Sequence, residues 1–307
     1  MCRYSIYNRG MQSNAPGVPS KRINSWLLGS RKIEFGNLPV LMGIVNVTPD
    51  SFSDGGRYFA HETAIARAIA LIDQGAGVID IGGESTRPYA EAVSADEELG
   101  RVLPVIAAVR RERPNAVVSI DTSKAVVAEA ALAAGAEIIN DVTGLTGDAR
   151  MVEVARVRQA GVCVMHMQGT PQTMQDDPQY TDAVSEIRNY LRERRDALVA
   201  AGVERERLCL DPGIGFGKTH AHNIELMSRC SIFHDLGQPL LVGHSRKAFL
   251  GKLMNDKEAD RTFATIGGAL ALARQGVQII RVHDVQAVRE ALLVFAACGG
   301  VAELAQQ

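Results

Sequence analysis

Eight short apolar runs recur along the chain, and each one ends on polar or charged residues. In order they are GIVNVT, VIDIGGEST, VVSIDTSK, IINDVTG, VCVMHMQG, LCLDPGIG, LLVGHSRK and IIRVHD. Asn46 in the first run and Arg281 in the last are 235 residues apart (281 minus 46), so the seven steps average about 34 residues, the length of one strand–helix unit. Continuous apolar runs are typical of strands buried on both faces of a parallel sheet. The pattern predicts an α/β protein with a single (β/α)8 TIM barrel, whose site lies at the carboxyl ends of the strands.

Between these runs, apolar residues recur at the three-to-four-residue spacing of helices. The predicted helices span residues 61–75, 96–111, 124–135, 148–161, 184–202 and 259–276. Four glycines stand one to three residues before an apolar run, namely Gly75, Gly135, Gly161 and Gly276. A glycine that ends a helix just before a strand is typical of alternating α/β folds, so we expect these four to end helices.

Three connections that leave strand ends are longer than ordinary turns. They cover residues 48–60, 82–94 and 166–180. Loops of about 12 residues or more are uncommon in compact domains and are usually functional. We expect these segments to fold over the barrel mouth.

The chain is predicted to have two parts. Residues 1–36 are a polar N-terminal extension, of which the first twenty or so are expected to be disordered or loosely attached. Within it, RKIEF is expected to form a short strand beneath the barrel. Residues 37–307 are the barrel domain, and about 250 residues is the usual size for this fold.

Composition narrows the class of protein. The 307 residues are 46% hydrophobic and 22% charged, with a net charge of −2, as in a globular protein with one large core. The small net charge gives no support for binding to nucleic acid or to an anionic membrane. The five cysteines are odd in number and lack C-x-x-C spacing, which suits a reducing cytoplasm. No apolar stretch of about 18 residues predicts a membrane span, and the N-terminus lacks the apolar segment of a signal peptide.

The segment GHSRKAFLG predicts a helix that begins directly after a strand. Ser245 is a good N-cap residue, and Arg246 and Lys247 would follow it in the first turn. Free N–H groups and two cations at a helix start favour binding of an anion. The alternative is a capped helix with solvated charges, and this segment alone does not decide between the two.

The segment RVHD places Arg281 and His283 two residues apart on one strand, so both side chains face the same way. A cation and an imidazole at the mouth of a barrel are suited to holding a phosphate or diphosphate, which is the interpretation we favour. In the alternative, Asp284 caps the next helix and Arg281 pairs with a carboxylate of the core.

Asp121, Asn140 and Asp211 each end a different strand. Carboxylates and an amide offer the acceptors and donors that match a flat heterocycle with several ring nitrogens. Metal binding by the carboxylates and helix capping are the competing interpretations.

The segment GIGFGKT resembles a phosphate-binding loop but fits neither fingerprint. Pro212 and Lys218 stand where the ATP and dinucleotide motifs need glycine, so we expect the glycines to let backbone approach a ligand. His166 lacks metal-ligand spacing and is ambiguous. Asn46 and Asp50 are plausible oxygen ligands for Mg²⁺.

Eight sequence blocks together resemble the dihydropteroate synthases, a folate-pathway family with a (β/α)8 barrel. The blocks are MGIVNVTPDSFSDGG, GGESTRP, SIDTSK, EIINDVTG, MHMQGTPQTMQ, LDPGIGFGKT, SRKAFLG and RVHDV. They occur in the family's order over about residues 40–300. The resemblance implies a transferase that condenses 6-hydroxymethyl-7,8-dihydropterin diphosphate with 4-aminobenzoate, giving 7,8-dihydropteroate and diphosphate. It also implies Mg²⁺ as cofactor, a cytoplasmic homodimer, and a candidate sulfonamide target.

The resemblance assigns roles residue by residue. The residues implied to hold the pterin ring are Asp121, Asn140, Asp211 and Lys247. Those implied to hold the diphosphate are Arg281, His283 and Asn46, with Asn46 also a ligand of Mg²⁺. Those implied to close over the site are Phe52, Thr86, Arg87 and Pro88, while Ser245 receives the aminobenzoate carboxylate. Met165, Phe216 and Val282 complete the implied substrate-binding set, and the implied catalytic residues are Asn46, Lys247, Arg281 and His283.

The chain departs from the family pattern at two positions. Tyr89 follows STRP where the family usually has glycine, and His244 stands where an apolar residue is common. Two alternatives remain. One is another pterin-binding barrel, such as the methyltetrahydrofolate domain of corrinoid methyltransferases, which would hold pterin in the same way but has no need of the diphosphate residues. The other, suggested only by Tyr89, is a paralogue that binds pterin without turnover. The apolar segments IGGALALARQG and ALLVFAACGG are candidates for a dimer interface, but they are equally suited to face the barrel.

Overall fold

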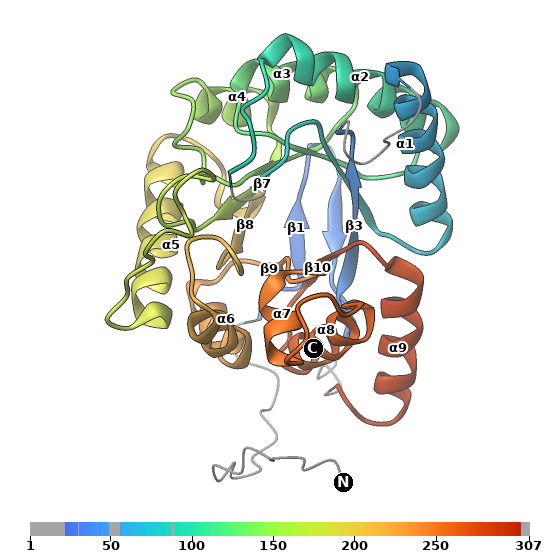
Figure 1. The fold of residues 1–307 in the computed structure, drawn as a ribbon. Coiled ribbons are helices and arrows are strands. Elements are labelled where there is room, and N and C mark those ends of the chain that lie inside the picture. The colour runs from blue at the N-terminus through green and yellow to red at the C-terminus, as the bar shows by residue number, and fades with distance from the viewer. Residues whose placement is uncertain (1–21, 30, 49–55, 87–88, 302–307) are drawn as a thin grey trace, which may run out of the picture.

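A computed structural model describes residues 22–29, 31–48, 56–86 and 89–301. Eight parallel strands lie in the order β8–β7–β6–β5–β4–β3–β10–β9. A parallel bridge between Leu210 of β8 and Leu240, next to β9, joins the two ends of this sheet. Helices surround the resulting ring of strands (Figure 1). The predicted (β/α)8 barrel is confirmed.

Each apolar run of the sequence overlaps one barrel strand. The strands are β3 (Val40–Asn46), β4 (Val78–Gly82), β5 (Val118–Asp121), β6 (Ile138–Asp141), β7 (Gly161–Met165), β8 (Leu208–Asp211), β9 (Leu241–Val242) and β10 (Ile279–Val282). The helices between and after them are α1 (Gly56–Asp73), α2 (Ala95–Glu112), α3 (Ala125–Ala133), α4 (Met151–Arg158), α5 (Ala183–Ala200), α6 (His220–Ser228), α7 (Ala248–Leu253), α8 (Thr262–Arg274) and α9 (Val285–Ala297). Helix α1 starts five residues earlier than predicted, which shortens the first long connection. Within the described ranges, no helix has the length and apolar character needed to cross a bilayer.

Three of the four predicted glycine helix ends are confirmed. Gly75, Gly135 and Gly276 adopt φ angles of +101°, +108° and +77°, which residues with a Cβ rarely adopt. The prediction for Gly161 is wrong, because Gly161 is the first residue of β7 and Gln159 takes the left-handed position instead, with φ +52°.

A two-stranded hairpin closes the bottom of the barrel. It pairs β1 (Ser25–Leu27) with β2 (Lys32–Glu34), and β2 is the strand predicted in RKIEF. Trp26 is fully buried, and its indole Nε1 donates to the backbone oxygen of Arg207 at 2.8 Å. The Arg207 guanidinium in turn donates to the oxygen of Leu28 at 2.8 Å. The hairpin lies in the stretch predicted as an extension and forms the floor of the barrel, while residues 1–21 lie outside the described part.

The interior of the barrel changes from apolar to polar along the strands. One apolar cluster joins the hairpin to residues near the strand starts, including Met42, Val78, Ile138, Cys163, Cys209 and Ile279. Two residues further along four of these strands stand Asp80, Asn140, Asp211 and Arg281. Because side chains two apart on a strand share a face, these polar groups also point inward, one layer above the apolar floor.

Candidate active site

Arg281 is the centre of an ion network in this polar layer. Its Nε donates to Asp80 Oδ2 at 2.6 Å, and its Nη2 donates to Asp121 Oδ2 at 2.7 Å. Asp80 is fully buried and also accepts from Asn140 Nδ2 at 3.0 Å. Arg281 therefore pairs with core carboxylates, as the alternative interpretation of RVHD holds. Two fixed contacts hold the guanidinium plane, and in the described residues no hydrogen bond uses its Nη1 group.

The network shifts the acidity of its members. Burial raises the pKa of Asp121 to about 7; Arg281 opposes this shift and the Asp80 charge adds to it. Burial lowers the pKa of Arg281, but Asp80 and Asp121 more than offset this, so the guanidinium stays charged. The layer thus combines a permanent cation with a carboxyl group whose pKa is raised by burial.

Lys247 and Asp211 form a second polar group in the mouth. The Lys247 ammonium donates to the backbone oxygen of Ile214 and lies 4.3 Å from the centre of the Phe216 ring. Burial lowers the pKa of Lys247 to about 7, against the opposing effect of Asp211. Asp211 accepts the N–H of Gly213 at 2.7 Å, and burial raises its pKa. A donor and an acceptor beside an aromatic ring are suited to the edge and face of a flat heterocycle.

The prediction that Ser245 caps a helix is wrong. Helix α7 begins at Ala248 with Lys247 as its N-cap, and no side chain caps it. The Ser245 hydroxyl instead accepts the backbone N–H of His283 at 3.2 Å and lies 3.0 Å from His283 Nδ1. Ser245 therefore belongs with the end of β10.

The predicted pair of cations at the helix start is also wrong. Arg246 adopts a φ angle of +57°, and its guanidinium binds both oxygens of Asp284 at 3.0 and 2.5 Å. Asp284 makes no side-chain cap of α9, contrary to the other half of the alternative. Lys247 alone faces the mouth.

His283 is held as a neutral imidazole. Burial lowers its pKa to about 4, and the nearby cations Arg281 and Arg246 lower it further. The Ser245 hydroxyl accepts the backbone N–H of His283 and lies within hydrogen-bond distance of its Nδ1; when the hydroxyl donates to Nδ1, the ring hydrogen lies on Nε2. His283 then offers a neutral hydrogen-bond donor.

The described residues contain no group of three or more His, Cys, Asp or Glu side chains placed to hold a metal. Asn46, the predicted ligand, ends β3 and is half-buried. Asp50 lies outside the described residues. Mg²⁺ commonly takes one or two protein oxygens and completes its shell with water and phosphate, so a single amide oxygen fits that ion better than Zn²⁺.

The glycines of GIGFGKT serve the protein's own packing. Gly213 and Gly217 have φ angles of +68° and +59°, and a Cβ on either would collide with backbone of the segment after β7. The expectation that these glycines also let backbone approach a ligand stays a prediction. Lys218 is buried and donates to Phe216 O at 2.8 Å, with its Nζ 3.0 Å from His166 Nδ1. Burial lowers the pKa of both Lys218 and His166, the latter to about 3, so this pair supports the loop that carries Phe216.

The other predicted substrate contacts differ in their placement. Met165 is buried at the end of β7, and Thr86 is half-buried after β4. Val282 is fully buried in the cluster between strands and helices, facing away from the mouth. Phe52, Arg87 and Pro88 lie outside the described residues.

The two departures from the family pattern have structural partners. Tyr89 has a φ angle of +62°, and its hydroxyl donates to Asp176 at 2.8 Å, so it links the connections after β4 and β7. The buried His244 ring lies 2.8 Å from Thr265 O, and a Cβ on Gly268 would lie 2.7 Å from this ring. The glycine in α8 thus leaves room for the histidine.

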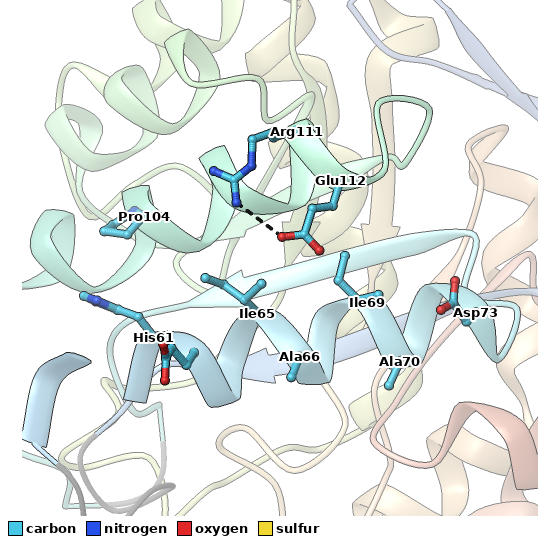
Figure 2. Close-up of a pocket in the computed structure, with 10 residues that line it drawn as sticks. His61, Ile65, Ala66, Ile69, Ala70, Asp73, Pro104, Arg111 and Glu112 are labelled. Carbon is cyan, nitrogen blue, oxygen red and sulfur yellow. Dashed lines mark hydrogen bonds and ion pairs between the residues drawn. The ribbon is translucent and has the colours of Figure 1, made fainter. Parts of the chain in front are cut away.

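A groove of about 800 Å³ lies outside the barrel between α1 and α2 (Figure 2). Ile65 and Ile69 of α1 and Pro104 and Arg111 of α2 are among its lining residues. No described residue of the predicted site lines this groove.

Comparison with known proteins shows which proteins this chain is similar to. The family model described as "Pterin binding enzyme" matches residues 42–283. The dihydropteroate synthase of Escherichia coli K12 is 46% identical over 256 residues, which cover 83% of this chain and 90% of that protein.

Solved structures share both fold and sequence. The Yersinia pestis dihydropteroate synthase in a sulfonamide drug complex has a TM-score of 0.83 and 42% identity, covering 90% of this chain and 99% of that one. The Xanthomonas albilineans enzyme with 4-aminobenzoic acid has a TM-score of 0.83 and 40% identity, covering 90% and 98%. The same enzyme in complex with 7,8-dihydropteroate has a TM-score of 0.80 and 38% identity, covering 90% and 98%.

Proposed function

The chain belongs to the dihydropteroate synthase family, and we propose that the two polar groups of its barrel mouth divide that family's reaction between them. The enzyme is a transferase of folate biosynthesis: it condenses 6-hydroxymethyl-7,8-dihydropterin diphosphate with 4-aminobenzoate. The observation that carries the assignment of roles is the inward polar layer of Asp80, Asn140, Asp211 and Arg281, to which Asp121 is bound through Arg281. The identity to named synthases favours this reaction over that of other pterin-binding barrels.

The pterin ring binds on the side of Asp121, Asn140, Asp211 and Lys247. The ring edge alternates donors and acceptors, and the carboxyl groups and the amide offer the complementary set. Phe216 supports this side by holding the Lys247 ammonium against its ring. With a pKa of about 7, Lys247 is able to donate to a ring oxygen or nitrogen at neutral pH.

The diphosphate binds on the side of Arg281, His283 and Asn46. Arg281 presents its Nη1 group and His283 its Nε2 hydrogen, and both are held in place before the substrate arrives. Because Asp80 and Asp121 offset the charge of Arg281, tight binding of a diphosphate needs a further cation. Asn46 would supply an oxygen ligand to Mg²⁺, which would offset charge on the leaving diphosphate.

These roles explain how the residues serve the reaction. Arg281 and His283 stabilise negative charge that develops on the diphosphate as its bond to the pterin methylene breaks. The pterin ring delocalises the positive charge left at that carbon. The neutral arylamine of 4-aminobenzoate then attacks, and it requires position more than a strong base. We propose that Ser245 lies where the aminobenzoate carboxylate binds, and that the same pocket admits sulfonamides.

One experiment tests the assignment. The protein is incubated with the pterin diphosphate, 4-aminobenzoate and MgCl₂, while dihydropteroate and diphosphate are quantified. We expect both products in equal amounts, with loss of activity after Lys247→Ala and recovery of EDTA-treated protein when Mg²⁺ is restored. Lys252→Ala is the matched control, because Lys252 is an exposed cation on the same helix. Absence of product from folded wild-type protein would refute the function, and equal activity of the two variants would refute the role of Lys247.

We further propose a homodimer built on the C-terminal helices. Large apolar side chains are exposed on α7 to α9 and next to them, namely Leu253, Met254, Phe263, Leu293 and Val294, with Phe263 81% exposed. Burial of such side chains between two copies is favourable by about 25 cal/mol per Å². Sedimentation should show a dimer that Phe263→Glu dissociates and that Val157→Glu, on the exposed face of α4, leaves intact. A monomeric wild type contradicts this proposal.

A cytoplasmic location is proposed on the cysteines. The four described ones, Cys163, Cys209, Cys230 and Cys298, are all free thiols. Free thiols persist in a reducing compartment. Fractionation of the producing cell would place the protein elsewhere if this is wrong.

A further inference from the structure

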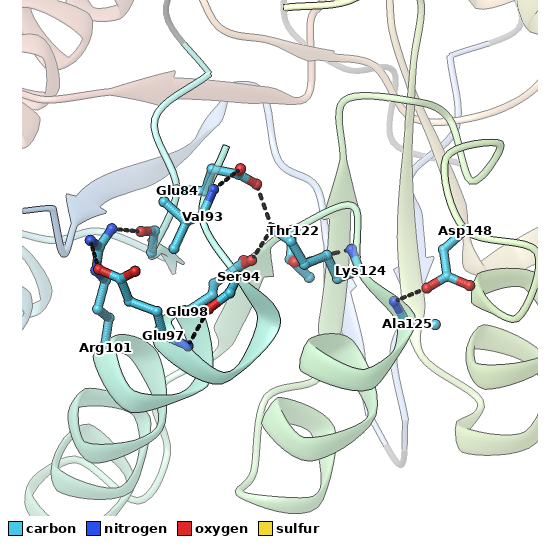
Figure 3. Close-up of polar contacts among 11 residues, drawn as sticks. Glu84, Val93, Ser94, Glu97, Glu98, Arg101, Thr122, Lys124, Ala125 and Asp148 are labelled. Carbon is cyan, nitrogen blue, oxygen red and sulfur yellow. Dashed lines mark hydrogen bonds and ion pairs between the residues drawn. The ribbon is translucent and has the colours of Figure 1, made fainter. Parts of the chain in front are cut away.

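A cluster of three charged side chains lies beside the mouth, outside the polar layer (Figure 3). Lys124 Nζ donates to Glu84 Oε2 at 2.7 Å and to Glu98 Oε2 at 2.6 Å. Glu84 follows β4, Lys124 follows β5, and Glu98 is in the first turn of α2. The cluster therefore joins three elements around the segment 83–94, which leaves β4 and enters α2.

Glu84 binds both ends of this segment. Its second oxygen, Oε1, accepts the backbone N–H of Val93 at 2.9 Å, nine residues further on. One carboxylate thus connects the start of the segment to its end, and to Lys124 at the carboxyl end of β5. Arg101 adds a further tie, because its Nη1 donates to the oxygen of Gly83 at 2.6 Å.

Lys124 is itself fixed in position. Its N–H donates to Thr122 Oγ1 at 3.2 Å, and the next N–H, of Ala125, donates to Asp148 Oδ2 at 2.9 Å. Burial lowers the pKa of Lys124, but Glu84 and Glu98 more than offset this and raise it. Lys124 is also three residues after Asp121, the carboxyl group that binds Arg281. The cluster therefore fixes the segment relative to the polar layer.

Glu98 makes this arrangement costly to change. It is fully buried, and its Oε1 has no hydrogen-bond partner among the residues that the structure describes. Loss of Lys124 would leave two carboxylates close together with no cation, one of them cut off from water. Gly83 packs on the same turn, since a Cβ there would lie 3.0 Å from Glu98 Cγ. The segment is thus held to α2 by both packing and charge.

We propose that Glu84 is a positioning residue for the synthase reaction: held by Lys124, it fixes both ends of the segment 83–94 and so sets where this segment presents Thr86 to the barrel mouth. This role rests on the proposed function only for its kinetic consequence. Glu84 touches no reacting atom in this scheme. It acts on the aminobenzoate step through the segment and leaves the pterin side unchanged.

The first test measures hydrogen exchange of residues 83–86 and 89–94, the described part of this segment, in full-length protein without substrates. Glu84→Ala removes the acceptor of the Val93 N–H, so exchange across the segment should quicken by about tenfold, or about 1.4 kcal/mol. Glu84→Gln keeps an acceptor and should restore most of the protection. Glu112→Gln is the matched control, since Glu112 is an exposed carboxylate at the far end of α2. Unchanged exchange in Glu84→Ala would overturn the proposal whether or not the enzyme is active.

The second test separates positioning from general stability. Glu84→Ala should raise KM for 4-aminobenzoate about tenfold, while the Kd for the pterin diphosphate stays within about twofold of wild type. If exchange quickens and the KM for 4-aminobenzoate does not change, Glu84 holds the segment in place but has no positioning role in the reaction, which refutes the proposal. If Glu84→Ala does not fold, Glu84→Asp provides the same comparison, because it keeps the charge and withdraws the carboxylate from the Val93 N–H by one methylene. Absence of product from wild type would refute the proposed function, and the exchange result alone would then decide whether Glu84 holds the segment.

Discussion

Replacement of Asp80 should separate two contributions to holding the buried Arg281, namely the charge of the Asp80 carboxylate and its hydrogen bonds. Asp80 accepts from Arg281 Nε at 2.6 Å and from Asn140 Nδ2 at 3.0 Å, and it is fully buried. Asp80→Ala leaves Arg281 with Asp121 as its one carboxylate and leaves the Asn140 amide without this acceptor. Asp80→Asn keeps an oxygen in place and removes only the charge.

The expected loss of stability follows from these contacts. Both hydrogen bonds of Asp80 are made to its charged carboxylate, and each bond of this kind is worth about 1.5–3 kcal/mol, so Asp80→Ala should cost about 3–6 kcal/mol. Breaking a buried ion pair costs about 3–5 kcal/mol, which agrees. Asp80→Asn should cost about 1–2 kcal/mol, because both donors keep an acceptor.

Urea unfolding followed by far-ultraviolet circular dichroism measures these differences. Asp73→Asn is the matched control, because Asp73 pairs with Arg113 at 2.9 Å with both side chains exposed, and such pairs contribute about 0–1 kcal/mol. Activity should fall at least about tenfold in Asp80→Asn, since Arg281 loses one of the two charges that orient it. If Asp80→Ala unfolds at the same urea concentration as Asp73→Asn, the Asp80–Arg281 pair does not stabilise the mouth and our reasoning about the polar layer is wrong.

Three further predictions concern the floor, the acid stability and the loops. Gly161→Ala should destabilise the fold by about 1–3 kcal/mol, because the added Cβ would lie 2.5 Å from a side chain of the hairpin. Gly100→Ala, whose Cβ would lie in open space on α2, should stabilise the fold by up to about 1 kcal/mol. If urea unfolding ranks the two variants in the opposite order, the described packing at Gly161 is contradicted. Burial lowers the pKa of His244 from its ordinary 6.5 to about 4, so the unfolded chain takes up a proton first and stability falls as pH drops from about 6.5 to 4. The Tm of His244→Leu should therefore fall less between pH 7 and pH 5 than the Tm of wild type. An equal fall in both would show that His244 does not cause the loss of stability in acid. Tyr89→Gly should change the inhibition constant of a sulfonamide, and Tyr89→Phe should show whether the hydroxyl contact with Asp176 is responsible for the change. Unchanged inhibition constants in both variants would show that the contact between the connections after β4 and β7 does not affect sulfonamide binding.

The barrel could be predicted from the sequence because its signal is local and repeated. Each strand is an apolar run, and each carries its polar residue at the same end. Alternation along the strand then places Asp211 above Cys209 and Arg281 above Ile279 without knowledge of the fold. Strand identity and the inward direction of the site residues followed from these rules alone.

The partners of the site residues could not be predicted, because they depend on closure of the ring. Arg281 reaches Asp80 across 201 residues of chain, and the strand between them in space is β3. Ser245 looked like a helix cap because serine often is one, yet its hydroxyl is used by His283, 38 residues later. Where β9 and β10 lie side by side, the contact with His283 overrides the local preference of serine for a helix N-cap position.

The interpretation of the charged positions shows the same limit. Glu84 and Lys124 are 40 residues apart and carry no spacing that marks them as partners. Lys218 appeared to be part of a failed phosphate motif, and the structure buries it against His166. A buried lysine beside a histidine had no signal in the sequence beyond its glycine-rich surroundings.

The single tryptophan of the chain is a built-in optical probe of how the protein folds. Its indole N–H is bound to a backbone oxygen 181 residues further along, so Trp26 stays in a solvated setting until the chain has formed β8 and its preceding turn. Contacts at such sequence separation form late and slow the folding rate. Fluorescence emission should therefore shift to the blue only in the last kinetic phase. Because the indole is fully buried at the floor of the barrel, its emission should not change when substrates bind at the opposite end. The emission of Trp26 should therefore report barrel closure alone.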